Sequence, residues 1–189
     1  MKSPILLRGL ALALFLATVP ASAQQMTEHQ LVGSLHQVTG TAPAVDVAVL
    51  IQELQSNPGQ GIGQLPAWSR LAQLPQLAVD IEFENNAVAI VPESYRTLGV
   101  IADALHNPIL QHQKFLIVGH TNATGKPEHN LELSSRRADA ILEALATTFS
   151  VPANHLVAIG VGQELPLDAT NPKAAANRRV QLINIGIAQ

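Results

Sequence analysis

The segment that most constrains the fold is a short apolar run that ends in a polar turn and leads into a long helical pattern. The β-rich run covers residues 115–119, the turn carries Thr121 and Asn122, and helical spacing extends over residues 128–149. That helix carries Arg136 and Arg137, and a second arginine pair precedes the last apolar run. The order gathers cationic and polar groups at one end of a sheet, which suits a ligand carrying a carboxylate and an amine.

The flanking segments predict a sheet whose strands alternate with helices. Residues 77–83 alternate between apolar and polar side chains, as in a half-buried strand. Pro92 suits the start of a helix, and the pair Asn107-Pro108 suits its end. Residues 156–160 and 180–187 read as the third and fourth strands. The predicted fold class is an α/β (α+β) sandwich with helices on one face of the sheet.

Five motifs occur in the order found in one known family. They are Gly119-His120-Thr121-Asn122 with Gly125; Asn130; Leu133-Ser134-Ser135-Arg136-Arg137-Ala138; Gly160-Val161-Gly162 with Pro166; and Asn177-Arg178-Arg179-Val180. Together they resemble the OmpA C-terminal-like (OmpA/MotB/Pal-type) peptidoglycan-associating domain, over about residues 77–187. The resemblance implies a β-α-β-α-β topology with a mixed sheet.

The resemblance also implies a binding site for the diaminopimelate residue of the peptidoglycan stem peptide. In the family an Asp pairs with the ammonium of this residue, and the position here is Asn122. Arg137 matches the family arginine that holds a carboxylate. The ligand-binding residues implied are Thr121, Asn122, Asn130, Arg137 and Arg179, and strand alternation turns only one of Arg178 and Arg179 inward.

Each of these residues also has a purely structural interpretation. Arg137 could be a solvated helix arginine paired with Glu132 or Asp139. Asn122 could only cap the turn, could accept a hydrogen bond from an ammonium, or could belong to a site for another anion. If it faces an ammonium, the loss of a full charge weakens the complex by about 1–2 kcal/mol, roughly tenfold.

The neighbouring turn residues carry the same two interpretations. Asn130 could order the loop instead of contacting the ligand, and a structural role is expected for it first. His120 is expected to stabilise the turn through a backbone hydrogen bond.

The amino terminus predicts an export signal. Lys2 and Arg8 precede an apolar run over residues 10–19, and Ala21-Ser22-Ala23 is a typical cleavage site. Residues 1–23 are therefore predicted to be a signal peptide, with an uncleaved anchor as the alternative. Residues 24–76 form an N-terminal extension with a polar lead-in and helices over 43–56 and 65–74, and residues 77–189 form the OmpA-like domain.

Composition excludes several functions. Without Lys2 and Arg8, 9 basic residues face 14 acidic ones, a net charge of −5, which does not suit nucleic-acid binding. The chain has no cysteine, so disulfides and thiol chemistry are excluded. Its 7 histidines show no metal-ligand spacing, and no serine sits in a nucleophile motif. No metal, cofactor or enzymatic activity is expected.

The combined expectation is a noncatalytic protein of the periplasm, associated with the outer membrane or cell wall of a Gram-negative envelope. Its partner is peptidoglycan, bound weakly because of Asn122, with envelope proteins as further partners. The alternative is a structural or protein-interaction module that kept the fold and lost peptidoglycan binding.

Overall fold

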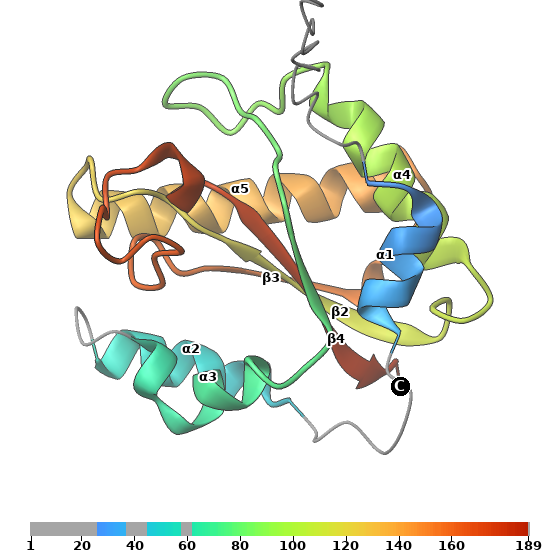
Figure 1. Ribbon diagram of the computed structural model, residues 1–189, viewed down its shortest axis with the longest axis horizontal. Helices are drawn as coiled ribbons and strands as arrows, with labels where there is room; N and C mark the ends of the chain where they lie inside the picture. The colour runs from blue at the N-terminus through green and yellow to red at the C-terminus, as the bar shows by residue number, and fades with distance from the viewer. Residues whose placement is uncertain (1–25, 37–44, 58–61, 189) are drawn as a thin grey trace, which may run out of the picture.

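A four-stranded mixed sheet forms the centre of the protein (Figure 1). The computed structural model describes residues 26–36, 45–57 and 62–188. The strands, in the spatial order β1-β4-β2-β3, are β1 (Gln76–Val79), β4 (Val180–Ile187), β2 (Gln113–Gly119) and β3 (Leu156–Gly160). The β2–β3 pair is parallel, and β4 runs antiparallel to both β1 and β2. The predicted mixed sheet and α+β class are confirmed.

The helices of the described residues come from both the extension and the family-like part. They are α1 (Glu28–Leu35), α2 (Val47–Ser56), α3 (Pro66–Leu71), α4 (Ser94–His106) and α5 (Pro127–Thr147), with single 3₁₀ turns η1 (Ile62–Gln64), η2 (Ala153–His155) and η3 (Ala175–Asn177). None of the helices in residues 26–36, 45–57 and 62–188 has the length and apolar character that a bilayer span requires. The predicted signal peptide lies outside the described residues.

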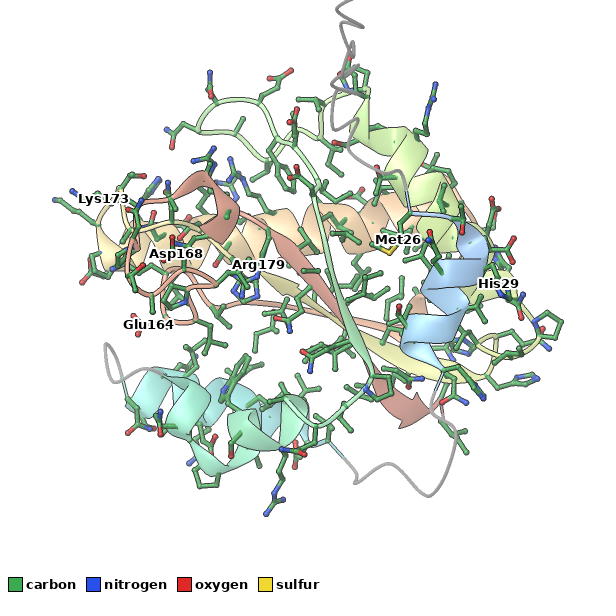
Figure 2. The ribbon with its side chains drawn as sticks, viewed as in Figure 1. Met26, His29, Glu164, Asp168, Lys173 and Arg179 are labelled. Atoms are coloured by element: carbon green, nitrogen blue, oxygen red, sulfur yellow. The ribbon has the colours of Figure 1, made fainter. Side chains whose placement is uncertain are left out.

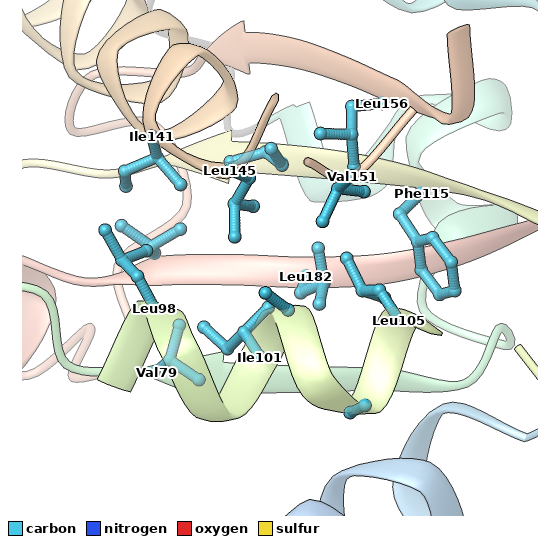
Figure 3. Close-up of a cluster of buried hydrophobic side chains, with 14 of the residues drawn as sticks. Val79, Leu98, Ile101, Leu105, Phe115, Ile141, Leu145, Val151, Leu156 and Leu182 are labelled. Atoms are coloured by element: carbon cyan, nitrogen blue, oxygen red, sulfur yellow. The ribbon is translucent and has the colours of Figure 1, made fainter. Parts of the chain in front are cut away.

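One face of the sheet is covered by α4 and α5, with α1 beside α4 (Figure 3). Leu98 of α4 and Leu145 of α5 are buried there against Phe115 and Leu182 of the sheet. The helical spacing expected for both segments produces this apolar stripe. The prediction that the helices share one face therefore holds for α4 and α5.

The other face is also covered, by helices of the N-terminal extension, which precede the part of the chain for which helices on one face were predicted. Residues of α2 and α3, including Leu50 and Trp68, pack with Leu116, Val118 and Ile183 of the sheet. Figure 1 shows these two helices on the side of the sheet away from α5. The reason is visible in β2, whose residues from 115 to 119 are all buried. A strand with two apolar faces needs a cover on each.

The polar segment before residue 40 contains a helix that its weak periodicity did not predict. Thr27 and Gln30 form a capping box at the start of α1, which buries Leu31 and Leu35. The Leu35 carbonyl accepts a 2.8 Å hydrogen bond from the amide of Asn184 in β4. In α2, the Asp46 side chain caps the helix by accepting from the Ala48 and Val49 nitrogens.

Two glycines let α5 approach the ends of the central strands. A Cβ on Gly119 would lie 2.3 Å from the Ser134 carbonyl oxygen, and a Cβ on Gly160 would lie 2.0 Å from the Ser135 nitrogen. Both contacts are with backbone atoms, so no side-chain rotation could relieve them. The close approach places the first turns of α5 directly against the polar turn that follows β2.

β1 is shorter than the predicted strand over residues 77–83. It pairs with β4 only as far as the Val79–Val180 position, after which Phe83 forms an isolated antiparallel bridge with Ile90. The alternation is nevertheless correct, since Val79 and Ile81 are buried while Asp80 and Glu82 are exposed. From Asp80 onward the chain leaves β4, and a gap opens between this segment and the rest of the sheet.

Candidate functional site

A cleft of about 1000 Å³ occupies the gap between residues 80–86 and the ends of β2 and β4. Its other walls are the turn after β2, the first turns of α5 and the segment that precedes β4. The structure brings every residue of the predicted site to this cleft: Thr121, Asn122, Asn130, Arg137 and Arg179. Arg178, the neighbour of Arg179, lines the cleft as well. Their roles toward a ligand stay predictions.

Arg137 is held at the cleft by the segment between β1 and α4. Its Nε donates a 3.0 Å hydrogen bond to the Ala87 carbonyl, and its guanidinium lies over the Phe83 ring, 4.7 Å from the ring centroid. The pKa of Arg137 is lowered mainly by burial and also by the nearby positive charge of Arg178. Among the described residues no ion pair with Glu132 or Asp139 is formed, so both Nη atoms remain available to a carboxylate.

The two arginines before β4 have different environments. Arg179, labelled in Figure 2, donates from Nη2 to the Leu165 carbonyl at 3.1 Å. Burial lowers its pKa. Arg178 is exposed and close enough to Arg137 for its positive charge to lower the pKa of Arg137. The sequence alone could not tell which arginine of the pair faces which group. In the structure Arg178 lies near Arg137, and the guanidinium of Arg179, the arginine named in the prediction, bonds the main chain.

Asn122 is buried, with 5% of its surface exposed, and both ends of its amide have protein partners. Nδ2 donates to the Lys173 carbonyl at 3.0 Å, and Oδ1 accepts from the Thr124 hydroxyl at 2.7 Å. The main-chain bond from Ala123 to the Pro172 carbonyl runs beside this link. Asn122 therefore ties the turn after β2 to the segment that leads to the arginine pair.

Asn130 connects the first turn of α5 to two loops. Its Nδ2 donates to the Asn122 carbonyl at 3.2 Å and to Gln163 Oε1 at 2.7 Å. A Cβ on Gly125 would lie 2.7 Å from Asn130 Oδ1, so the glycine leaves room for this amide. These contacts fit the loop-ordering role that was expected first for Asn130.

Thr121 and His120 form the buried floor of the turn. The Thr121 nitrogen donates to the Gly162 carbonyl at 2.8 Å, which joins the turn to the segment after β3. His120 Nε2 lies 3.1 Å from Gln181 Oε1. Burial, assisted by the charge of Arg179, lowers the pKa of His120 to about 3, so the ring is neutral at neutral pH. The ring of His120 thus bonds a side chain on β4, whereas a backbone hydrogen bond was predicted.

Three acidic residues of the cleft were not singled out in the sequence. Asp80, Glu82 and Glu84 line the cleft from the segment that leaves β4, and all three are exposed. The alternation over residues 77–83 is the signal that could have placed them together on one side. The cleft therefore contains both half-buried or exposed arginines and solvated carboxylates.

Metal binding is not indicated in the part of the chain that the structure describes. There, no group of three or more histidine, aspartate or glutamate side chains is arranged to hold an ion. The Ser134 hydroxyl donates to the Leu131 carbonyl and accepts from the Gly162 nitrogen, both at 2.8 Å, so it bonds the main chain.

This combination of sheet order, turn and arginine-bearing helix matches known proteins. The OmpA family model covers residues 82–179, which is more than half of the 189 residues. The chain belongs to the OmpA family. The structure of the OmpA-like domain of FopA1 from Francisella tularensis has the same fold, with a TM-score of 0.50, 13% identity and coverage of 59% of this chain and 74% of that one.

Curated relatives match a little over half of this OmpA-family chain. The peptidoglycan-binding protein ArfA of Mycobacterium tuberculosis is 30% identical over 105 residues, which cover 54% of this chain and 31% of ArfA. Outer membrane porin F of Pseudomonas fluorescens is 29% identical over 113 residues, covering 59% of this chain and 34% of the porin. The chain thus spans about a third of the length of these relatives.

Proposed function

We propose that this OmpA-family protein binds the stem peptide of peptidoglycan in the cleft, with a ligand carboxylate on Arg137. The observation that carries the proposal is the state of Arg137, whose Nε and ring stacking fix the guanidinium while its two Nη atoms stay available. A fixed planar fork suits bidentate binding of a carboxylate. Arg178, beside it in the cleft, adds a second positive charge.

The relatives support the same ligand class. ArfA of Mycobacterium tuberculosis, which matches 54% of this chain, is named a peptidoglycan-binding protein. Because peptidoglycan lies in the cell envelope, the proposal places this protein in the periplasm, next to the outer membrane or cell wall. The predicted signal peptide over residues 1–23 would deliver it there.

The proposed role is noncatalytic. The groups around Arg137 are a backbone carbonyl, an aromatic ring and a second arginine, which can hold an anion. A hydrolytic site would need an acid and a base on the reacting bond. In the described cleft the carboxylates are exposed and stand together on one segment, an arrangement that does not separate their roles.

Cosedimentation of the purified protein with peptidoglycan sacculi tests the proposal. Arg137→Ala should weaken binding by roughly 10- to 150-fold, since a hydrogen bond to a charged group is worth about 1.5–3 kcal/mol. Arg136→Ala is the matched control, because Arg136 is the exposed neighbour on the same helix and does not line the cleft. Binding should also decrease as salt rises.

Two results would count against the proposal. Equal pelleting of the Arg137→Ala and Arg136→Ala variants would remove Arg137 from the site. A wild-type protein that stays soluble beside sacculi at low salt would favour the alternative function, a structural or protein-interaction module that kept the OmpA fold.

A further inference from the structure

The buried amide of Asn122 limits what the cleft can recognise. Its Nδ2 is committed to the Lys173 carbonyl and its Oδ1 to the Thr124 hydroxyl, and only 5% of its surface is exposed. Asn122 is also uncharged. This turn residue therefore offers no charge to an amine of the ligand, and its acceptor oxygen, the group that an ammonium would need, already accepts from Thr124.

The cleft also contains negatively charged side chains, but their positions are not fixed by contacts with described residues. Asp80, Glu82 and Glu84 are exposed, and no hydrogen bond or ion pair to a described residue fixes their carboxylates. An exposed ion pair is worth at most about a fivefold gain in affinity, because water screens the charges and the side chains lose freedom. These carboxylates can attract an amine without fixing its position.

The arginines differ in this respect. Arg137 is half-buried, fixed by Ala87 and Phe83, and has Arg178 as a neighbour. A charge-assisted, bidentate contact in such a setting is stronger than a solvated ion pair. The two ends of a ligand that carries both a carboxylate and an amine are therefore recognised unequally.

We infer that the affinity of the cleft for its ligand depends on the ligand carboxylate and hardly on the amine beside it. The substrate class is then a stem peptide whose diaminopimelate carboxylate is free, whether its side-chain amine is free or acylated. Acylated amines are the form present in cross-linked peptidoglycan, so the cleft accepts cross-linked and uncross-linked strands alike. The inference rests on the proposed function and names its ligand more narrowly.

Three synthetic stem tripeptides that end in diaminopimelate, each with the terminal α-carboxylate blocked as an amide, test it by calorimetry on the whole protein. The first has a free side-chain amine, the second has that amine acetylated, and the third has the side-chain carboxylate converted to a carboxamide. The free and acetylated probes should differ by less than about fivefold in Kd, while the carboxamide should lose at least about tenfold. Asp80→Asn combined with Glu82→Gln and Glu84→Gln should change the affinity for the free-amine probe by less than about fivefold.

The outcomes separate this inference from the proposed function. A free-amine probe that binds more than about fivefold tighter than the acetylated one overturns the inference and leaves Arg137 binding intact. Equal binding of the carboxamide overturns the assignment of the carboxylate to Arg137. If none of the three probes binds and sacculi do not retain the protein either, the proposed function fails together with the inference.

Discussion

The amide nitrogen of Asn122 lies 3.0 Å from the carbonyl oxygen of Lys173 and donates a hydrogen bond to it. These residues stand 51 positions apart in the chain, in the two loops that border the cleft. An aspartate has no hydrogen to donate at this position. The residue that departs from the family pattern is thus part of the scaffold of the cleft.

Asn122→Asp should therefore destabilise the protein. The change puts a buried carboxylate oxygen opposite the Lys173 carbonyl, so two acceptors face each other and the hydrogen bond is lost, at a cost of about 1–3 kcal/mol. Urea unfolding at neutral pH measures the loss. Asn85→Asp is the matched control, because Asn85 is exposed on the same cleft, and it should change stability by less than about 0.5 kcal/mol. Equal stability of the two variants would contradict the role of the Asn122 amide.

The buried His120 should make stability depend on pH. Its pKa is lowered to about 3 in the folded protein, against 6.5 for an ordinary histidine. Between these values the unfolded chain binds a proton that the folded chain does not, so stability falls as pH falls below 6.5. From pH 7 to pH 5 the loss attributable to His120 is roughly 2 kcal/mol.

Two variants isolate this effect of pH. His120→Gln should reduce the difference in unfolding free energy between pH 7 and pH 5 by roughly 2 kcal/mol. This holds even if the substitution changes the unfolding free energy at pH 7. His112→Gln should leave that difference unchanged, since His112 is exposed. Measuring urea unfolding at both pH values for the three proteins decides the matter, and a His120→Gln protein with the full wild-type difference would refute the assignment.

Gly160→Ala should be among the most damaging small substitutions in the chain. The new Cβ would lie 2.0 Å from the Ser135 nitrogen, so α5 would have to move away from β3, at a cost of about 3 kcal/mol or more. Gly33→Ala in α1 makes the same chemical change where nothing lies within 4 Å. That variant should gain up to about 1 kcal/mol, because alanine favours a helix. Thermal unfolding followed by circular dichroism compares them.

The extension should unfold together with the OmpA-like part. Trp68, the single tryptophan, is buried in α3 and donates from Nε1 to the Leu50 carbonyl at 3.0 Å. Its fluorescence reports on α2 and α3, whereas far-ultraviolet circular dichroism is dominated by α4 and α5. Because α3 shares a core with β2 and β4, both signals should give one urea midpoint. Separate midpoints would support an independent extension with a boundary near residue 77.

The sequence determined those elements whose local patterns are strong. The last strand was predicted over residues 180–187 and the third over 156–160, and both bounds are confirmed. Continuous apolar character and flanking turn residues leave little choice of conformation there. The motif order likewise sufficed to identify the family, since each block serves a local need such as the close approach at Gly119 or the turn at Gly125.

Only the tertiary structure decided how distant groups share the cleft. The engagement of Asn122 by Lys173, the separation of Arg178 from Arg179 and the cover of α2 and α3 on the second face all join segments far apart in the chain. Local sequence does not predict such partners, because a hydrogen bond or an apolar contact depends on which segments of the chain the fold brings together. For this protein the family follows from the sequence, and the role of its one departing residue follows from the loop packed against it.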